Sequence, residues 1–330
     1  MEEARRIVFS CIIPASKNDL DSQNLKDLIA SIKAQDFPQD QIEILVITEG
    51  DSEQAKAIGI RRAKGEICAM FCADNYLIDK TSFSEIYNAF NFNVTGAYSK
   101  HYAVVKSDNS LNRYFSLMGN NDPIAFYLGK CDRKPWYEVN QKERHTVMDF
   151  RYGLESLGDN GFFYRRKHLL ESDLDHYYPM DNAEDLNRKG MSFYIRTNQV
   201  HVWHRTTNSS LISFLIRRYR YARDLYCDRN DRRWKMLDTR EDYWRLVFFV
   251  IATLTVIQPL SISLRGWFKI RDRAWFWHPL VAFGFLITYT ILAFRNLFRY
   301  GNFFQRRQDE ILCQNKEAQA RDVRIKKETV

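Results

Sequence analysis

Apolar residues in the first part of the chain fall into short runs separated by segments with helical periodicity. The runs Ile7–Pro14, Ile42–Ile47 and Ile67–Phe71 are aliphatic and rich in β-branched residues, which is typical of buried parallel strands. Between them, Asn24–Ala34 repeats leucine and isoleucine at helical spacing, and Gln54–Arg62 predicts a second, shorter helix. Strands that alternate with helices in this way predict an α/β fold with a doubly wound sheet.

The pattern continues less regularly over the next part of the chain. Strand-like sequence covers Asn93–Val105, and a polar stretch without a clear period, Asn121–His145, predicts a loop over a site. Five further elements are expected, three short strands and two helices: 161–164, 193–196, 200–203, Leu111–Met118 and Ser210–Tyr226. The second of these helices is strongly basic.

Two longer apolar windows follow, Leu246–Leu264 and Ala274–Phe294, and neither contains a charged residue. About 20 apolar residues cross a bilayer core, so both windows predict transmembrane helices. Pro259 is expected to kink the first. The basic connection Arg265–Arg273 conflicts with a hairpin whose preceding α/β domain faces the cytoplasm, because positive loops favour the cytoplasmic side. Re-entrant or interfacial packing of one segment removes that conflict, and a pair of buried soluble helices is the remaining alternative.

Charge adds to this picture. The formal net charge is +8, with 45% hydrophobic and 27% charged residues, so a folded core is expected. Basic residues concentrate from Arg217 onward beside the apolar windows, which favours a membrane surface or a phosphate group over nucleic acid as the partner. The sequence predicts a catalytic domain over residues 1–228, a membrane-associated region over 229–300 and a charged tail over 301–330.

The cysteines and the first residues bear on the compartment. The six cysteines show no spacing typical of a zinc site, and several lie within strand-like runs. Residues 1–7 lack the apolar core of a signal peptide. Both observations favour a membrane protein whose catalytic domain faces the reducing cytoplasm.

Polar residues follow each of the first three predicted strands. In doubly wound sheets ligands bind at the carboxyl ends of the strands, so these positions are the first candidates for a site. They lie in Ala15–Asn18, Thr48–Asp51 and Cys72–Asn75. Asp74, at the end of the third strand, is the carboxylate best placed to hold a divalent cation.

Five phrases occur in an order that resembles a known family. They are IIPASKN, SIKAQDFPQDQIEILVIT, AIGIRRAKGEICAMFCADN, AEDLNRKG and VHVWH, spread over residues 7–226. Together they resemble the inverting family 2 glycosyltransferases with the GT-A fold, a Rossmann-like mixed sheet. The resemblance implies transfer of a sugar from a UDP- or GDP-sugar with the help of Mg²⁺ or Mn²⁺.

The resemblance assigns the metal to Asp74, with Asn75 as a further oxygen ligand or a residue that orients water. His204, at the end of VHVWH, matches a position that ligates the metal or contacts the diphosphate, although a lone histidine is as often structural. Cys72 stands where the family has its first aspartate, and a thiol is a poor ligand for Mg²⁺ or Mn²⁺.

The nucleoside is expected near the first two strands. Pro14, Ala15 and Ser16 correspond to the loop that cradles base and ribose, and either Glu49 or Asp51 corresponds to the acid that contacts them; a solvated loop carboxylate is the alternative for both acids. In the basic helix, Arg217 and Arg220 share one face and suit a diphosphate or a lipid phosphate. The same helix is also typical of one that lies on anionic lipid.

For catalysis the resemblance points to Glu184 and Asp185. Inversion needs a base that takes the proton of the acceptor hydroxyl, and Asp185 matches that residue, with Glu184 positioning it or binding the acceptor. Acids that open a helix have a structural explanation as well. Gly161, in the phrase GDNGFFYRR, matches the lining of a sugar pocket.

The sequence therefore predicts an inverting hexosyltransferase that uses a membrane-associated acceptor, either a lipid-linked glycan or a polyprenyl phosphate, in cell-surface glycan synthesis. The alternative is a catalytically degenerate, glycosyltransferase-like scaffold of a glycan-assembly complex, which Cys72 favours. No nucleic-acid-binding module is recognisable, and the oligomeric state cannot be inferred from the sequence.

Overall fold

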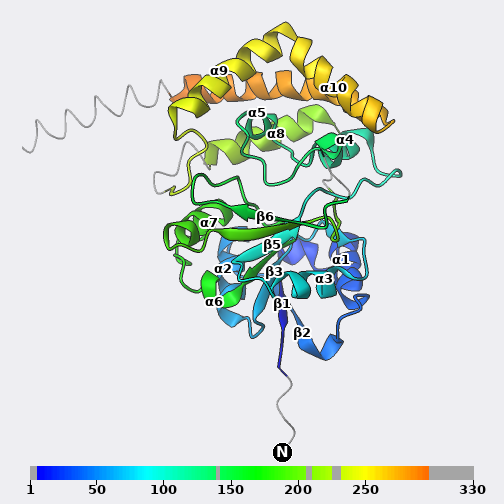
Figure 1. Ribbon diagram of the computed structural model, residues 1–330, viewed down its shortest axis with the longest axis vertical. Coiled ribbons are helices and arrows are strands. Elements are labelled where there is room, and N and C mark those ends of the chain that lie inside the picture. The colour runs from blue at the N-terminus through cyan, green and yellow to red at the C-terminus, as the bar shows by residue number, and fades with distance from the viewer. Residues whose placement is uncertain (1–5, 139–141, 206–209, 225–231, 297–330) are drawn as a thin grey trace, which may run out of the picture.

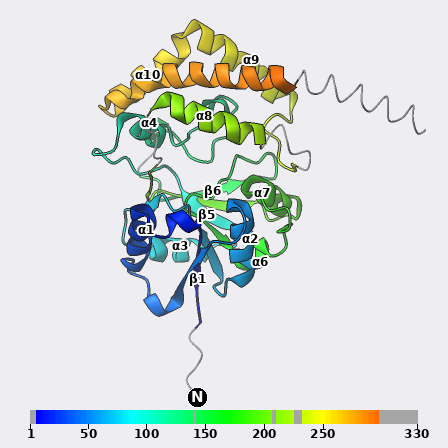
Figure 2. The same ribbon diagram turned by 180° about the vertical axis from the view of Figure 1, so that it is seen from behind.

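The computed structural model describes residues 6–138, 142–205, 210–224 and 232–296. A mixed β-sheet with helices on both faces forms one end of the molecule, and a layer of helices forms the other (Figures 1 and 2). The last part of the expected helix Ser210–Tyr226 and the predicted charged tail, residues 301–330, lie outside the described residues.

The main sheet has seven strands in the order β2-β1-β3-β7-β5-β8-β6. Their bounds are β1 Phe9–Pro14, β2 Ile42–Ile47, β3 Ile67–Met70, β5 Gly96–Ser99, β6 His145–Asp149, β7 Phe162–Arg165 and β8 Phe193–Thr197. The pairs β1–β2, β1–β3 and β5–β8 are parallel, whereas β7 and β6 run antiparallel to their neighbours. The expected α/β fold with a mixed sheet is therefore confirmed.

Each face of the sheet is covered by its own set of helices. On one face, α1 (Gln23–Lys33) and α3 (Ser82–Ala89) pack against alternate side chains of β1 such as Phe9 and Ile13. On the other face Ile12 packs with α2, α6 and α7. Those three helices span Ser52–Arg62, Arg166–Leu169 and Pro179–Arg188. Because successive strand residues point to opposite faces, a continuous apolar run serves both layers.

A small second sheet lies at the carboxyl edge of the main one. Its strands are β4 (Asn75–Leu77) and β9 (Val202–His204), which pair antiparallel with Asn75 opposite His204. These two strands join a segment directly after β3 to a segment more than a hundred residues later. The short strand expected over 200–203 is thus present, and its pairing places two predicted site residues together.

The helical layer draws on distant parts of the chain. Helices α4 (Ser110–Met118) and α5 (Pro123–Tyr127) pack with α8 (Leu211–Ala222), α9 (Arg240–Thr255) and α10 (Ile257–Lys269) in one apolar cluster. The segment Asn121–His145, expected to be a loop, thus contains α5, a 3-10 turn at Trp136–Glu138 and the start of β6. Asp122 caps α5 through the N–H groups of Ile124 and Ala125, and a proline follows it, a helix-start signal that outweighs the polar composition of the segment.

Over the window Leu246–Leu264 the structure differs from the one continuous helix that the sequence predicts. The segment is two helices, α9 and α10, whose axes differ by 83° at a break after Thr255. Val256 forms the break in the left-handed region, with φ 62°. The proline ring of Pro259 would collide with the carbonyl of Thr255 in a continuous helix, so the expected bend of this window falls one turn before the proline and is sharp enough to end α9 and begin α10.

The second window behaves differently. A helix runs over Arg273–Asn296, and by length and hydropathy it is long enough to cross a bilayer, although a third of its apolar stretch is buried against the protein. In the described part of the chain it is the single straight helix with that property; the bent pair α9 and α10 counts as a second only if both arms together form one span.

Candidate active site

The turn after β3 brings chemistry to the carboxyl edge of the sheet. The N–H of Asn75 donates to the carbonyl of Cys72 (2.9 Å), and the N–H of Cys72 donates to the side-chain oxygen of Asn75 (3.0 Å). The side-chain amide of Asn75 also donates to Asn160 (3.2 Å), from the loop before β7. Asn75 is buried, so it holds the turn that presents Asp74 and does not itself face a ligand.

Asp74 lies against His204. The β4–β9 ladder and a bond from the Arg205 N–H to the Asp74 carbonyl (2.9 Å) fix the two residues side by side, with Nε2 of His204 3.3 Å from the Asp74 carboxylate. Burial alone would raise the pKa of the Asp74 carboxyl, but the charge and hydrogen bond of His204 and the charge of Arg217 outweigh it and lower that pKa. Asp74 is therefore an ionised carboxylate, and the sequence-predicted pair Asp74 and His204 is brought together.

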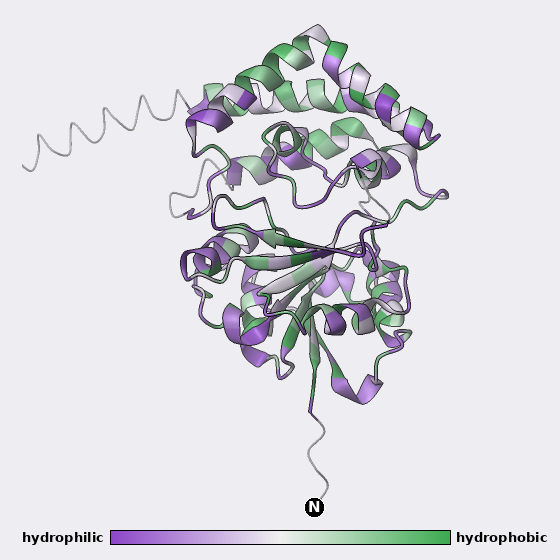
Figure 3. Cartoon of the chain, in the orientation of Figure 1, coloured by the Kyte–Doolittle hydropathy of each residue, from purple (hydrophilic) through white to green (hydrophobic). Residues whose placement is uncertain are grey.

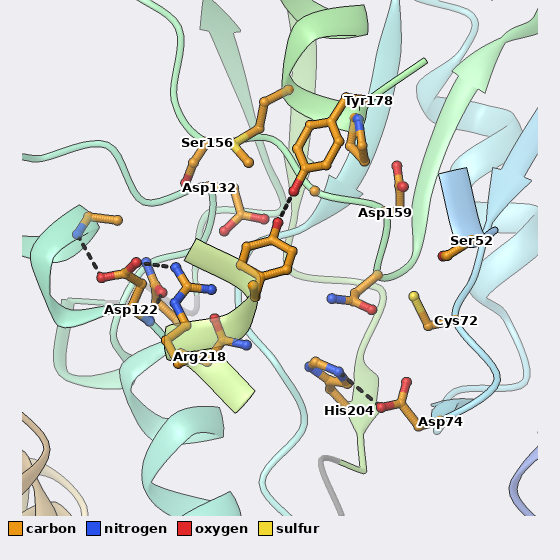
Figure 4. Close-up of a pocket in the computed structure, with 18 of the residues that line it drawn as sticks. Ser52, Cys72, Asp74, Asp122, Asp132, Ser156, Asp159, Tyr178, His204 and Arg218 are labelled. Atoms are coloured by element: carbon orange, nitrogen blue, oxygen red, sulfur yellow. Dashed lines mark hydrogen bonds and ion pairs between the residues drawn. The ribbon is translucent and has the colours of Figure 1, made fainter. Parts of the chain in front are cut away.

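A cavity of about 430 Å³ opens beside this pair, between the sheet edge and the helical layer (Figure 4). Three of the sequence-predicted site residues line it, Asp74, His204 and Arg217. Four further carboxylates also line it: Glu53, Asp122, Asp132 and Asp159. The hollow is of the size that binds a small molecule, and many of the residues that line it are charged or polar.

One wall carries a buried ion pair that the sequence did not reveal. Lys56, on α2, lies with its ammonium 2.7 Å from Asp159, and both side chains are almost fully buried. Burial alone would lower the pKa of Lys56, but Asp159, with smaller effects from Cys72 and Glu53, outweighs it and raises that pKa. No local signal marks the pair, because its members come from segments about a hundred residues apart.

Cys72 lines the same wall of the cavity. Burial raises the pKa of its thiol to about 12, against the lowering effect of Lys56. A protonated thiol binds neither Mg²⁺ nor Mn²⁺ well. The departure from the family pattern at this position is thus a neutral side chain packed beside a buried ion pair.

The opposite wall is formed by α8. Arg217 faces the cavity and acts on Asp74 through its charge, and Arg218 pairs with Asp122, which also accepts a hydrogen bond from the hydroxyl of Tyr289 (3.0 Å). Arg220 is exposed and does not line the cavity. The two arginines expected to act together are therefore separated, and Arg218, which the sequence did not single out, takes a place in the wall.

A fully buried guanidinium lies behind the lining residues Asp132 and Tyr102. Arg133 donates to Asp132 (2.7 Å), to the hydroxyl of Ser99 (3.0 Å) and to that of Tyr102 (3.1 Å), and it lies over the Tyr102 ring. It also donates to the carbonyl of Asn160. Burial raises the pKa of the Asp132 carboxyl, although the charges of Arg133 and Arg196 oppose that shift. Asp132 is consequently a cavity carboxylate with increased affinity for a proton.

Glu184 and Asp185 lie elsewhere. The helix that contains them begins at Pro179, so the pair sits in its second half and does not open it. Asp185 forms an ion pair with Arg233 (2.7 Å), and Glu184 forms one with Arg188 (2.7 Å). Neither lines the cavity; the start of the helix does, through Tyr178, Pro179 and Met180.

The residues expected around the nucleoside end β1 and β2 at the same edge, because Pro14 pairs with Ile47. Ser16 closes a capping box with Asp19, and Glu49 forms a two-point ion pair with Arg62 (2.8 and 3.0 Å). Pro14, Ala15, Ser16 and Glu49 do not line the cavity.

Asp51 caps α2 and lines a neighbouring hollow of about 590 Å³ that shares Glu53 with the first. Gly161 has φ 71°, and a Cβ there would lie 2.5 Å from the side chain of Val202, so it shapes the loop that presents Asp159 and Asn160.

The donor atoms present fit a cation that is only partly held by protein. Among the described residues no group of three or more His, Cys, Asp or Glu side chains could enclose a metal ion. One carboxylate and one imidazole, Asp74 and His204, leave most positions to oxygens of a substrate and water, which is the usual arrangement for Mg²⁺ at phosphate sites. Imidazole nitrogen is a softer ligand that the transition metals accept more readily than Mg²⁺ does.

No protein-family model matches this chain, and no curated protein matches it. Among solved structures it is similar to S. aureus TarS (fragment 1–349), with 12% identity over 86% of this chain and 90% of that one and a TM-score of 0.42. It is also similar to the mannosyltransferase PcManGT from Pyrobaculum calidifontis in complex with GDP-Man and Mn²⁺, with 11% identity, 86% and 87% coverage and a TM-score of 0.44.

A third similar structure is the catalytic domain of Drosophila β1,4-galactosyltransferase 7 in complex with xylobiose, with 10% identity, 73% and 79% coverage and a TM-score of 0.35. At this level of similarity the activity has to be inferred from the residues of the cavity.

Proposed function

We propose that this chain is a glycosyltransferase of the GT-A type that transfers a hexose from a UDP- or GDP-sugar to an acceptor at a membrane. The observation that carries the proposal is the placement of Asp74 and His204 beside Arg217 in a cavity at the carboxyl edge of the sheet. Arg217 beside the Asp74 carboxylate, at the edge of the sheet where ligands bind, suits a diphosphate with a bound metal ion.

Asp74 and His204 would hold the divalent cation, Mg²⁺ or Mn²⁺. When bound, such a cation supplies Lewis-acid stabilisation of the charge on the departing nucleoside diphosphate. Arg217 adds a fixed positive charge from α8, and the Asn75 side chain keeps the Cys72–Asn75 turn closed so that Asp74 keeps its direction. The nucleoside would lie over the ends of β1 and β2, near Pro14, Ala15, Glu49 and Asp51.

The proton of an acceptor hydroxyl has to be taken up inside the cavity. We propose Asp132 for this step, because it lines the cavity and its raised pKa favours proton uptake. Asp185, the residue matched by the family resemblance, would have to leave its ion pair with Arg233 to reach a substrate. If the acceptor is an ionised lipid phosphate, no base is required and neither residue is critical.

Two substitutions separate these assignments. Asp132→Asn is expected to lower transfer to a hydroxyl acceptor by about 100-fold or more, the usual range for losing a general base. Asp185→Asn is expected to leave transfer within a few-fold of the wild type. The rate of sugar transfer is measured for both variants. A large loss for Asp185→Asn and a small one for Asp132→Asn would make Asp185 the base. If neither substitution lowers the rate, the acceptor is a phosphate.

Calorimetric titration of the purified protein with UDP and GDP, with and without Mn²⁺, tests the donor site. Binding that requires metal is expected for the wild type, and Asp74→Ala should lose roughly 100-fold or more in affinity, since about 1.4 kcal/mol corresponds to tenfold. Arg220→Ala is a suitable control, because Arg220 is exposed and does not line the cavity. Equal affinity of the Asp74 variant and the wild type would contradict the proposal.

The finer parts of the proposal rest on the sequence. We propose inversion at the anomeric carbon as in family 2, a lipid-linked glycan or polyprenyl phosphate as acceptor in cell-surface glycan synthesis, and a catalytic domain that faces the cytoplasm. The basic helix α8 beside the apolar helices supports a phosphate-bearing lipid acceptor.

A degenerate scaffold is a second candidate. It is favoured by the neutral thiol of Cys72 at the edge of the site and by the engagement of Glu184 and Asp185 in ion pairs. Assays with a panel of nucleotide sugars distinguish an active enzyme from a scaffold. Hydrolysis or transfer with any of them supports the enzyme, whereas absence of both together with absence of nucleotide binding supports the scaffold.

A further inference from the structure

The outer surface of the helical layer is apolar on three helices at once. On α9 the exposed residues include Trp244, Phe248, Ile251 and Leu254, the last being 62% exposed. On α10 and the helix Arg273–Asn296 the exposed stripes are Ile257, Leu260, Leu264 and Phe268, and Phe276, Leu280, Phe283, Ile287, Ile291 and Phe294. These stripes lie at helical spacing, and the green outer helices of Figure 3 belong to the same layer.

We propose that α9 and α10 form a wedge that enters one leaflet of a lipid bilayer, with both ends of the wedge on the side of the catalytic domain. The wedge is the pair Arg240–Thr255 and Ile257–Lys269, and its apex is the break at Val256. The proposal concerns how the protein attaches to a membrane and does not depend on which reaction it catalyses.

Neither arm of the wedge is long enough to cross the hydrocarbon core by itself. At about 1.5 Å per residue, the 16 residues of α9 cover about 24 Å and the 13 residues of α10 about 20 Å, whereas the hydrocarbon core is about 30 Å thick. The 83° bend sets the two arms nearly at right angles, and in Figure 1 the break between α9 and α10 points away from the sheet.

Residue types change with distance from the apex as lipid depth requires. Leu254, Val256 and Ile257 at the apex are aliphatic and largely exposed, and no charged residue occurs between Arg245 and Arg265. The exposed aromatic residues Trp244 and Phe268 and the exposed cations lie together toward the two ends of the wedge; the cations are Arg240, Arg245, Arg265, Lys269, Arg271 and Arg273. An aliphatic apex with aromatic and basic residues at both ends matches an acyl region entered from an interface with anionic headgroups.

Val256 supplies an independent observation. It is the one non-glycine residue with positive φ in the described part of the chain, and glycine would occupy that backbone without strain. The side chain is half exposed, so packing does not account for a β-branched residue there. An apolar contact outside the protein at the apex does account for it.

The helix Arg273–Asn296 lies flat under the same surface. Trp275 is fully buried, Gly284 packs against Leu215 of α8, and Arg295 donates to the hydroxyl of Tyr219 (3.2 Å), so contacts to the rest of the protein follow its whole length (Figure 2). The exposed apolar stripe of this helix lies on the side that faces away from these contacts. Because both ends of the wedge stay on one side, the basic connection 265–273 also stays there, which removes the charge conflict of a two-span hairpin.

Co-flotation of the full-length protein with phosphatidylcholine vesicles that contain phosphatidylglycerol tests the wedge. The wild type is expected to float, and the double variant Leu254→Asp/Ile257→Asp should lose about tenfold or more of its vesicle-bound fraction, since a charge at the apex must enter the acyl region. Phe92→Asp is the matched control, because Phe92 is 55% exposed on the loop between α3 and β5 and should leave binding unchanged.

The side of the membrane is tested by Lys269→Cys on sealed vesicles. A membrane-impermeant maleimide added outside should modify this variant beyond the background of the wild type, because the wedge keeps residue 269 outside. Protection until the vesicles are opened would show a span and overturn the proposal. Failure of the wild type to float, or equal flotation of the double variant, would overturn it as well.

A second copy of the chain is the other possible occupant of this surface. It would appear as a dimer in light scattering that the double variant dissociates, without vesicle binding, and that result would also overturn the wedge. Nucleotide titration of the same samples is unaffected by any of these outcomes, so failure of the wedge and failure of the glycosyltransferase proposal are distinguishable.

Discussion

At the scale of single residues, the cavity depends on charges that neutralise one another. Asp74 faces His204 and Arg217, and Arg218 faces Asp122. Such groups are stable away from water only while their partners remain, because an unpaired buried charge costs several kcal/mol. The polar wall is therefore sensitive to single substitutions in a way that exposed ion pairs are not.

The buried pair Lys56–Asp159 allows a direct comparison. Lys56→Met should reduce the free energy of unfolding by about 3 kcal/mol, because Asp159 is left without its counter-ion. The double variant Lys56→Met/Asp159→Leu should recover much of that loss. Arg62→Met, which breaks the half-exposed pair with Glu49, should change stability by no more than about 0.5 kcal/mol. Equal losses for the buried and the exposed pair in urea unfolding would contradict this account.

At the scale of elements, the break between α9 and α10 is the feature that the apolar pattern hid. The mean hydropathy of a window contains no information on backbone direction, so Leu246–Leu264 has the pattern of one continuous helix. The sequence predicts a bend from Pro259, and the break lies after Thr255, whose carbonyl the proline ring would strike in a continuous helix. Conversely, Ile42–Ile47 was predicted with the bounds that β2 has, because its run of apolar residues is short and bounded on both sides.

Val256 gives a prediction with a matched control. Val256→Gly should increase the free energy of unfolding in detergent solution by about 1 kcal/mol, because glycine adopts positive φ without the Cβ clash. Val247→Gly, at a similarly exposed site in the middle of α9, should decrease it by about 0.5 kcal/mol. A loss of stability for both variants would show that the Val256 backbone is not strained.

Attachment of α9 to the domain depends on pH through Asp242. Burial alone would raise the pKa of this carboxyl, but hydrogen bonds from Lys130 and from the N–H groups of Thr239 and Asp238 lower it from 3.8 to about 2. Because the folded-state pKa is below the unfolded one, this contribution is present above about pH 4 and is lost as the pH falls toward 2.

The shift corresponds to about 2 kcal/mol of stability. Asp242→Asn should lack it, so the difference in unfolding free energy between wild type and variant should shrink between pH 5 and pH 2 (about 2 kcal/mol). A difference that stays constant over this range, in urea unfolding at each pH, would show that Asp242 makes no such contribution.

At the scale of the whole molecule, the main sheet and the apolar face lie at opposite ends, and α8 lies between the cavity and the outermost helices. Arg217, Arg218 and Tyr221 of α8 line the cavity, while Leu215 and Tyr219 contact the helix Arg273–Asn296. A membrane bound at the wedge would thus lie one helix away from the site, near enough for an acceptor held in that membrane.

Activity should therefore depend on the wedge only when the acceptor is in a membrane. With Leu254→Asp/Ile257→Asp, hydrolysis of the nucleotide sugar in solution should stay near the wild-type rate, whereas transfer to an acceptor in vesicles should fall about tenfold or more. Phe92→Asp should change neither rate. A parallel loss of hydrolysis would indicate misfolding. Unchanged transfer to the acceptor in vesicles would show that transfer does not require membrane binding through the wedge.

Local patterning of the chain was enough for the alternating strands and helices, the carboxylate at the end of β3 and the apolar character of the last third, because burial repeats along each element with its own period. The contact between Asp74 and His204, the Lys56–Asp159 pair and the position of Asp132 arise between segments far apart in the sequence, and no local pattern encodes them. The same holds for Glu184 and Asp185, whose helix begins earlier than their composition suggests, and for the wedge, whose direction depends on one residue and one proline ring. Periodicity decides which side of an element is buried, but only the packing of elements against one another decides what each buried or exposed group meets.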